Sequence, residues 1–475
     1  MADAYGPDQR RVLIIGTDGL RPDSVDPARM PTCAKLMEEG TLFTAFHAAY
    51  PSETRVSMTT LTTGVYPGRH GVVSNLMYVP GFGEDGWLQT GNDQHLLAYR
   101  PMMSEPLILQ PTLGDRLHRR GKRLAVAGSS SPGASLLWNL HHPEAVLNPA
   151  STYGRSALEA VHRRLGKVPE ERTKVKKELA LWATRAMIEC HLKNEENQVM
   201  VLWLSEPDAS QHDYGIGSPA HLEALQAVDA CVAMLLEALE REGLGEKIDI
   251  LWISDHGHST LRARGSLEMH VQDAIQELKL TTKFAAAGHS IYVAEKTDLA
   301  EREGRELIDW LQSQDWCELV FAQDPLPLQR PDVLPLELLL GPITHRRAPF
   351  LAIQPKWSDE RNACGVPGIT EALTSKPKLY SSHGTVSPFD MHAFCLGAGP
   401  HFKKGHVSDL PCGIVDIAPT VCHLIGLHEE TGFDGRVLVE GLQGGYKPEW
   451  LSFFARTPST HKSPRRFALL DRRGI

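Results

Sequence analysis

The chain of 475 residues predicts an α/β fold, a three-layer sandwich in which helices flank a mostly parallel central sheet, with an inserted cap subdomain. Short continuous apolar runs that end in polar residues or glycine recur along the chain, as buried parallel strands do. Segments with helical spacing lie between these runs. The pattern changes near residue 262 and resumes near residue 393, as expected for an insertion into the sheet.

Five apolar runs are the candidate buried strands. They are RVLIIGTD (11–18), RLAVAG (123–128), VMVLWLSEPD (199–208), DILWISDHG (249–257) and AFCLGAG (393–399). The clearest helix is SPAHLEALQAVDACVAMLLEALEREG, with Ser218 as N-cap, Pro219 at the first helical position and Gly243 after the last turn. A second helical stretch, from about 160 to 194, carries a basic cluster that we interpret as a solvated face.

The change of pattern also sets the predicted domain boundaries. Between the strands, short elements rich in proline and leucine, such as QDPLPLQRPDVLPLELLLGP, interrupt the sheet pattern. We expect a metal-binding core at 1–261 and 376–454, with the inserted cap at 262–375. The basic tail at 455–475 has few core residues and is expected to be a C-terminal arm.

Composition narrows the possible partners and location. Apolar residues make up 42% and charged residues 23%, and a net charge of -9 gives no electrostatic reason to expect a nucleic acid polymer. No run reaches the roughly 18 apolar residues of a membrane span, and the N-terminus MADAYGPDQRR does not resemble a signal peptide. Eight isolated cysteines without CxxC spacing favour reduced thiols in the cytoplasm. The sequence leaves open whether the protein forms a homodimer.

Three predicted strands carry an aspartate at or just beyond their carboxyl end: Asp18, Asp208 and Asp255. In a parallel sheet these ends gather at one edge, where α/β folds keep their ligands. Taken singly, each has a structural explanation, since Asp18 could cap a turn and Asp208 could be an N-cap. Three carboxylates at one edge would repel one another unless cations neutralised them.

Histidines accompany these aspartates. His212 follows Asp208 by four residues, His256 is adjacent to Asp255, and His383 lies in YSSHGT, shortly before the strand that closes the insertion. A lone loop histidine such as His383 is ordinarily bonded to backbone. The joint pattern favours a pair of metal ions, because aspartate and histidine are ligands for Zn²⁺ and similar borderline metals.

The stretch YPSETRVSMTTLTTGVYPGRHG supplies a candidate nucleophile. RVSMTTLTT has helical character and Gly64 ends it, which places Thr54 at or beside the N-cap, where the helix dipole favours an anion. Threonine at that position is usually only a cap. A metal ion near it would let its hydroxyl ionise near neutral pH and act as a nucleophile.

The ordered motifs GTDGLRPD, PSETRVSMTTLTTGVYPGRHG, EPDASQHDYG, SDHG and SSHGTVSPFDMHAFCLGAGPHF resemble the alkaline phosphatase superfamily, most closely its nucleotide pyrophosphatase/phosphodiesterase and phosphonoacetate hydrolase branch. The resemblance implies two divalent metal ions. It assigns one to Asp208, His212 and His383. The ligands that it assigns to the other are Asp18, Thr54, Asp255 and His256.

The same resemblance implies a mechanism and an alkaline phosphatase-like fold. The alkoxide of Thr54 would attack phosphorus, and water would then hydrolyse the phospho-threonine. Relatives carry an asparagine three residues after the nucleophile, where this chain has Ser57. Arg55 is a candidate substitute that would bind non-bridging oxygens, against the alternative that it faces solvent, and Asn75 is a further substrate-binding candidate.

The expected function is hydrolysis of small-molecule phosphodiesters, with Zn²⁺ as the expected metal and Mn²⁺ or Fe²⁺ as alternatives. A carbon–phosphorus bond hydrolase of the phosphonoacetate hydrolase type is the alternative, and it would need two cationic groups close to the metals. Phosphomonoester hydrolysis is a third possibility. A binding protein stabilised by metals is the non-enzymatic alternative, which closed four-ligand sites would favour.

Overall fold

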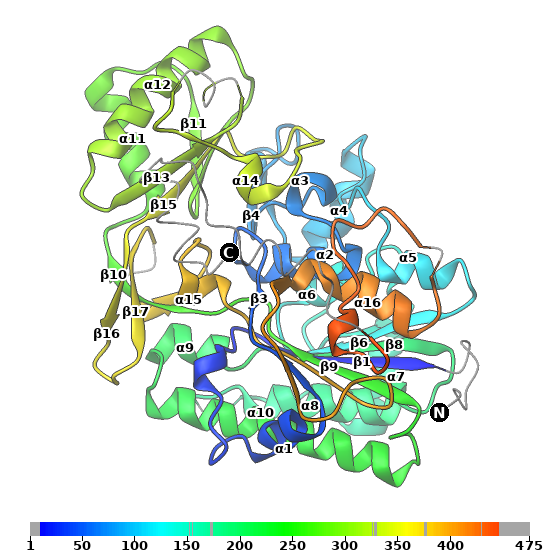
Figure 1. The fold of residues 1–475 in the computed structure, drawn as a ribbon. Coiled ribbons are helices and arrows are strands. Elements are labelled where there is room, and N and C mark those ends of the chain that lie inside the picture. The colour runs from blue at the N-terminus through cyan, green and yellow to red at the C-terminus, as the bar shows by residue number, and fades with distance from the viewer. Residues whose placement is uncertain are drawn as a thin grey trace.

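The computed structural model describes residues 10–151, 153, 155–171, 174–324, 326, 330–374, 378–428 and 430–445 (Figure 1). The predicted C-terminal arm lies outside the described residues. At the centre is an eight-stranded sheet in the order β20-β2-β19-β9-β1-β8-β6-β7. In chain order its strands are β1 (Arg11–Thr17), β2 (Thr41–Phe43), β6 (Arg123–Gly128), β7 (Val146–Leu147), β8 (Asn197–Leu204), β9 (Ile248–Ile253), β19 (Cys395–Ala398) and β20 (His406–Ser408).

The sheet is mostly parallel, as predicted. Strand β1 lies between β8 and β9 and pairs with both in parallel, and β6 pairs in parallel with β8 and β7. The expectation that the AFCLGAG strand is parallel was wrong, because β19 pairs antiparallel with both β9 and β2. The segment that returns from the insertion reaches the sheet at the edge where β9 ends, so its strand runs back in the opposite direction.

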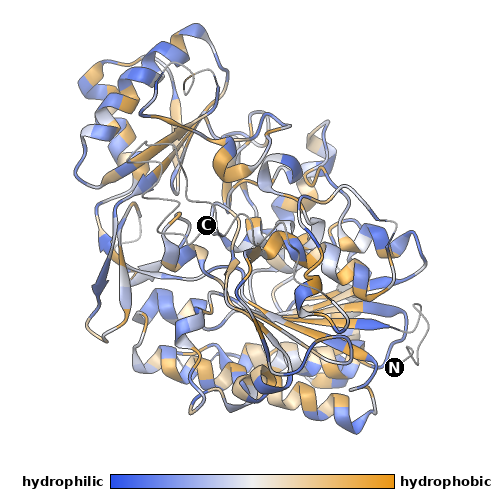
Figure 2. Cartoon of the chain, viewed as in Figure 1, coloured by the Kyte–Doolittle hydropathy of each residue, from blue (hydrophilic) through white to orange (hydrophobic). Residues whose placement is uncertain are grey.

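Helices cover both faces of this sheet, and β1 shows why. Val12 and Ile14 pack into one core, while Leu13 and Ile15 pack into the other, so the strand is apolar on both sides (Figure 2). The helices packed in the first core are α2 (Thr54–Thr63), α5 (Leu113–His118), α6 (Pro132–Leu137) and α16 (Ile417–Leu424). Those packed in the second core are α1 (Pro31–Glu39), α8 (Lys177–Ala186) and α10 (Pro219–Arg241).

The predicted helix ends are confirmed for α10, because the Ser218 hydroxyl accepts from the His221 backbone N–H and Pro219 opens the helix. Gly243 follows with a φ of 65°. The charged stretch from 160 to 194 does not form one helix. It divides between α7 (Arg155–Leu165) and α8, with a π-helical turn at Met187–His191.

The segment between β9 and β19 contains a sheet of its own. Its strands, in the order β11-β12-β15-β13-β14, are β11 (Phe284–Ala287), β12 (Ser290–Val293), β15 (Leu351–Pro355), β13 (Cys317–Ala322) and β14 (Leu334–Pro335). Helices α11 (Leu267–Leu278) and α12 (Asp298–Ser313) complete a separate apolar core, so the segment is more regular than the expected short elements. It projects from the central sheet (Figure 1). The exact division at 262 and 375 stays a prediction.

A four-stranded sheet links this segment to the central sheet. Its order is β16-β17-β10-β18, with β10 (Ser259–Ala263), β16 (Trp357–Arg361), β17 (Pro367–Ala372) and β18 (Ser381–Ser382). The remaining short elements include β3 (Phe46–His47), β4 (Leu76–Tyr78), β5 (Trp87–Gln89), α3 (Pro67–His70), α4 (Asp93–Met102), α9 (Asp208–Tyr214), α14 (Glu337–Leu340), α15 (Pro388–Met391) and β21 (Cys412–Gly413).

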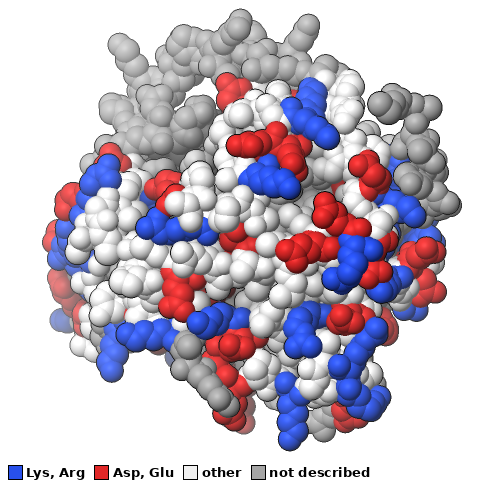
Figure 3. Space-filling view, turned by 90° about the horizontal axis from the view of Figure 1, so that it is seen from below, with Lys and Arg blue, Asp and Glu red and all other residues white. Residues whose placement is uncertain are grey.

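The surface carries acidic and basic side chains in close mixture. Figure 3 shows both signs interspersed over one face, which agrees with the absence of a nucleic acid signal in the composition. All eight cysteines are free thiols. Within the described part of the chain, every helix is too short or too polar to cross a bilayer.

Candidate metal centre and nucleophile

The order of the central sheet brings the three predicted aspartates together. Asp18, Asp208 and Asp255 follow β1, β8 and β9, which are neighbours in the sheet and run in the same direction. The Asp208 backbone N–H donates to the Asp18 carbonyl at 3.1 Å, and the Gly19 N–H donates to Asp255 Oδ1 at 3.1 Å. All three carboxylates therefore lie at one edge, as the strand ends predicted.

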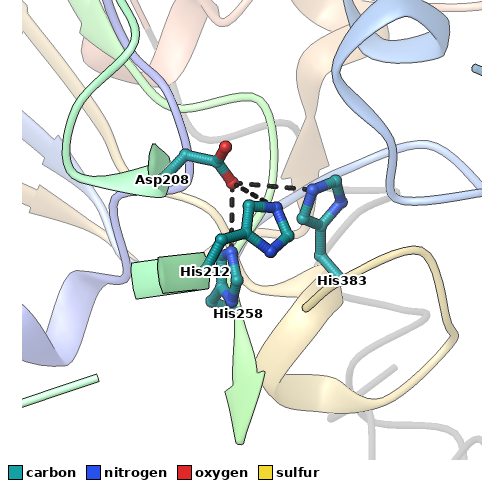
Figure 4. Close-up of side chains that lie close together, drawn as sticks. All are labelled: Asp208, His212, His258 and His383. Atoms are coloured by element: carbon teal, nitrogen blue, oxygen red, sulfur yellow. Dashed lines mark hydrogen bonds and ion pairs between the residues drawn. The ribbon is translucent and has the colours of Figure 1, made fainter. Parts of the chain in front are cut away.

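Four side chains form what we call the histidine-rich group: Asp208, His212, His258 and His383. Their imidazole Nε2 atoms converge on Asp208 Oδ1, at 3.4 Å for His212, 3.0 Å for His258 and 3.5 Å for His383 (Figure 4). Asp208 and His212 lie one turn apart on α9, so both face the same way. One carboxylate oxygen surrounded by three imidazole nitrogens is a donor set suited to one divalent ion.

His258 was not among the predicted ligands. It directly follows the motif SDHG, two residues after His256, immediately before β10 begins at Ser259. The stretch SDHGH thus contributes His256 to one group of ligands and His258 to the other. A sequence signal was present, because a second histidine directly follows the SDHG motif, but only the turn into β10 shows where its side chain points.

Asp18, Asp255 and His256 form a second cluster, which we call the aspartate-rich group. His256 Nε2 lies 3.6 Å from Asp18 Oδ1 and 3.3 Å from Asp255 Oδ2. The Thr54 hydroxyl completes it, because its Oγ1 is 3.4 Å from both Asp18 Oδ1 and His256 Nε2. The structure therefore brings together all the residues that the resemblance assigned to this second site.

Backbone carbonyls fix the tautomer of three of the four histidines. His212 Nδ1 donates to the Ser381 carbonyl at 2.8 Å, and His256 Nδ1 donates to the Gly257 carbonyl at 2.8 Å. His383 Nδ1 donates to the Ser52 carbonyl at 2.7 Å. Because a carbonyl only accepts, these bonds keep the proton on Nδ1 and leave the Nε2 lone pair for a metal.

The two groups differ in their electrostatics. Burial raises the pKa of Asp18 well above its usual range, and the neighbouring Asp255 and Asp208 carboxylates raise it further. Burial likewise raises the pKa of Asp255. Burial alone would also raise the pKa of Asp208, but the surrounding imidazoles outweigh it and hold that pKa well below its usual range. A cation is therefore needed most in the aspartate-rich group.

Thr54 begins α2, and Glu53 is the N-cap. The helix ends at Gly64, whose φ of 72° gives the left-handed stop that the sequence predicted. Buried Glu53 accepts from the Ser74 hydroxyl at 3.1 Å and from the Asn75 backbone N–H. The Asn75 side-chain oxygen in turn accepts from the Arg55 backbone N–H at 3.1 Å. Glu53 and Asn75 therefore hold the first turn of the nucleophile helix in place.

A cleft of about 590 Å³ opens beside this helix, and Thr54 and Arg55 line it together with Asp18 and Asp208. Ser57, a predicted substrate-binding residue, does not line this cleft. It is fully buried and its hydroxyl donates to the Asp255 carbonyl at 3.0 Å, so it supports the aspartate-rich group from behind.

Several basic and aromatic residues that do not line the cleft have structural partners of their own. Trp87 packs against Tyr78, with ring centroids 5.3 Å apart, and does not line the cleft. Arg262 and Arg264 both pair with Glu371. His345 contacts the Pro67 carbonyl, and Arg347 donates to the Leu107 carbonyl.

Comparisons with known proteins agree with this arrangement. Residues 12–355 match the family model described as type I phosphodiesterase / nucleotide pyrophosphatase. Human ectonucleotide pyrophosphatase/phosphodiesterase family member 1 is 25% identical over 427 residues, which cover 86% of this chain and 40% of the human protein. Venom phosphodiesterase 2 of Crotalus adamanteus is 25% identical over 256 residues, covering 53% of this chain and 27% of the venom protein. The chain thus spans less than half the length of these curated relatives.

Solved structures show the same fold. An inactive variant of murine ectonucleotide pyrophosphatase/phosphodiesterase 5 in complex with AMP superposes with a TM-score of 0.62 at 18% identity, covering 91% of this chain and 100% of the murine chain. A second structure of the same murine protein superposes with a TM-score of 0.61. The predicted alkaline phosphatase-like α/β architecture is therefore confirmed.

Proposed function

The chain belongs to the type I phosphodiesterase / nucleotide pyrophosphatase family, and from that premise we propose that it is a metal-dependent phosphodiesterase with Thr54 as its nucleophile. The observation that carries the proposal is the position of the Thr54 hydroxyl. It lies 3.4 Å from Asp18 and His256 and lines a cleft large enough for a small-molecule ester.

The two groups fit a pair of divalent ions. Carboxylate and imidazole donors suit Zn²⁺, our first choice, as well as Mn²⁺ or Fe²⁺. Asp255 Oδ2 is buried without a hydrogen-bond partner in the described structure, as expected for an atom reserved for a cation. We assign one ion to the histidine-rich group and the other to the aspartate-rich group with Thr54. Bound ions would neutralise the carboxylates, lower the pKa of the Thr54 hydroxyl and stabilise charge on the phosphoryl group.

The chain's own residues then carry out the reaction. Oγ1 of Thr54 loses its proton and attacks phosphorus, the bond to the leaving oxygen breaks, and the departing alkoxide takes up a proton to leave as an alcohol. Water cleaves the resulting phospho-threonine, which releases a phosphomonoester and restores the hydroxyl. We propose that the NH₂ group of Asn75, whose side-chain oxygen accepts from the Arg55 backbone N–H, donates to a phosphoryl oxygen. The N-terminal end of α2 favours the developing negative charge.

A carbon–phosphorus bond hydrolase is the second candidate function, and one observation about the cleft supports it. That reaction would need two cationic groups near the metals, and Arg55 and Lys176 both line the cleft. Both belong to the central α/β part rather than to the predicted cap. A purely metal-stabilised binding protein agrees less well, because Thr54 lines an open cleft.

Turnover and metal content test the proposal together. Purified protein is expected to contain two ions per chain, to hydrolyse bis-p-nitrophenyl phosphate, and to lose this activity in a chelator and regain it with Zn²⁺. Phosphonoacetate and p-nitrophenyl phosphate serve as the competing substrates. Faster turnover of phosphonoacetate would assign the second candidate instead, and metal without turnover of any ester would assign a binding protein. A cytoplasmic location stays a prediction.

A further inference from the structure

Arg55 is a cation without a counterion. No hydrogen bond or ion pair of its guanidinium is found among the described residues, and its Nε is buried without a partner. Buried arginines elsewhere are bonded: Arg21 pairs with Asp23, and Arg116 pairs with Glu430. Arg55 is half-buried, and leaving its buried Nε unbonded costs free energy, so its presence at a ligand cleft is suited to an anionic ligand.

The surroundings of Arg55 are shaped to hold it at the cleft. A Cβ atom added to Gly91 would lie 2.7 Å from Arg55 Nη2 and 3.3 Å from Cζ, so the guanidinium rests against the bare backbone of this glycine. Any larger residue at 91 would displace it. The guanidinium lies close enough to Asp18 to lower the pKa of that carboxyl group, which places it next to the aspartate-rich group.

The rest of the cleft is of mixed polarity, with apolar residues such as Val168, Leu179 and Leu379 beside polar ones. Lys176 and the three consecutive hydroxyls of Ser129, Ser130 and Ser131 line it, with Asp213 exposed at its rim. None of the described lining residues is Phe, Tyr or Trp. Recognition of a nucleobase ordinarily uses aromatic faces for stacking, so this lining is better suited to a charged, hydrogen-bonding group.

A count of charges supports the same conclusion. Asp18, Asp208, Asp255 and an ionised Thr54 hydroxyl carry four negative charges, which two divalent ions would balance. The transferred phosphoryl group would lie against those ions. A diester phosphoryl group brings one negative charge and Arg55 and Lys176 bring two positive charges, so one positive charge is left for another anion on the same substrate.

We propose that the cleft binds a second anionic group of the substrate, a carboxylate or a phosphate, through Arg55, with Lys176 also lining the cleft. The planar guanidinium offers two parallel N–H donors to such a group. The inference rests on the proposed function only for the position of the first phosphoryl group. It predicts small doubly anionic substrates rather than nucleotides.

Calorimetric binding to the metal-loaded protein tests this without turnover. The probes are methyl phosphate, phosphoglycolate, ethane-1,2-diol bisphosphate and thymidine 5′-monophosphate. Phosphoglycolate or the bisphosphate is expected to bind at least about tenfold more tightly than methyl phosphate, as for a charged hydrogen bond. The ranking of these two identifies the second group as carboxylate or phosphate.

Arg55→Gln is expected to reduce that preference to within about threefold, whereas Arg100→Gln, on the exposed face of α4, is expected to retain it. Metal content and thermal melting establish that both variants are folded. Three results would overturn the inference: tightest binding of the thymidine ligand, no preference for a second anion in the unsubstituted protein, or equal weakening of methyl phosphate and phosphoglycolate by Arg55→Gln. The last would mean that Arg55 binds the transferred phosphoryl group. Failure to hydrolyse any diester would contradict the proposed function alone, since the binding order is measured independently.

Discussion

The histidine-rich and aspartate-rich groups adjoin each other at one sheet edge, but they balance charge differently. The rings of His383 and His256, one from each group, stack with centroids 3.6 Å apart. The side chains of Asp208 and His212 are 17% and 22% exposed, whereas those of Asp255 and His256 are fully buried. The histidine-rich group is therefore the one nearer solvent.

This difference shows how adjacent sites can have separate tasks. In the histidine-rich group, three imidazoles surround one carboxylate and lower its pKa. In the aspartate-rich group, two buried carboxylates share one imidazole; burial raises the pKa of both, and the Asp255 carboxylate raises that of Asp18 further. The second arrangement needs a cation, and it is the one that contains Thr54. We infer that the aspartate-rich group activates the nucleophile, while the histidine-rich group holds the other ion.

Removing the nucleophile should have the largest effect. Thr54→Ala is expected to reduce kcat for bis-p-nitrophenyl phosphate by about 10³-fold or more, because no other hydroxyl replaces it. Thr54→Ser keeps a hydroxyl and should retain much of the activity. Metal analysis should still find two ions in both variants. Undiminished turnover by Thr54→Ala would contradict the inference that the aspartate-rich group activates Thr54.

Substituting one carboxylate in each group distinguishes the roles of the two ions. Asp255→Asn and Asp208→Asn should each reduce the affinity for one ion by about 100-fold or more. Loss of even a hydrogen-bond partner of a metal ligand reduces metal affinity by about 10–100-fold. Asp255→Asn should reduce kcat more than Asp208→Asn at saturating Zn²⁺, because its group contains Thr54. Titration with Zn²⁺ followed by turnover measures both quantities. Equal losses of kcat would contradict the assignment of roles.

His258 tests the composition of the histidine-rich group. His258→Gln should reduce the affinity of the protein for one ion by about 10–100-fold and leave its affinity for the other nearly unchanged. Competition with a chromophoric chelator gives both affinities. His270→Gln, on α11 in the projecting segment, is the matched control. If both ions bind as in the unsubstituted protein, His258 is only a hydrogen-bond partner of Asp208.

The smallest expected effect is on the stability of protein stripped of metal. Because the pKa values of Asp18 and Asp255 are raised on folding, the folded state keeps protons that the unfolded state releases above pH 3.8. The melting temperature of stripped protein should therefore fall by roughly 2–4 °C between pH 5 and pH 8. Asp208 has the opposite sign, because its lowered pKa contributes stability above pH 3.8 that is lost as the pH falls below that value. The melting temperature of metal-loaded protein should not fall with pH in this way. An equal fall in both forms would contradict the inferred difference in charge balance between the two groups.

Much of the site could be predicted from local sequence. Apolar runs that end in Asp18, Asp208 and Asp255 identify buried strands, and parallel pairing brings their ends together whatever the intervening segments do. The spacing of Asp208 and His212 places both on one turn of a helix. Gly64 predicted the end of the nucleophile helix because its left-handed φ is a local property.

The folded chain alone decided the rest, because those features depend on contacts between distant residues. The direction of β19 follows from where the inserted segment returns, and that path also brings His383 to Asp208, from which it is 175 positions away in sequence. His258 joins the histidine-rich group only because β10 turns away from the sheet edge. Ser57 faces the buried side of α2, while Arg55, two residues earlier, faces the cleft and rests on Gly91. Sequence determines which residues are available at a strand end or helix turn, and three-dimensional packing determines what each side chain meets.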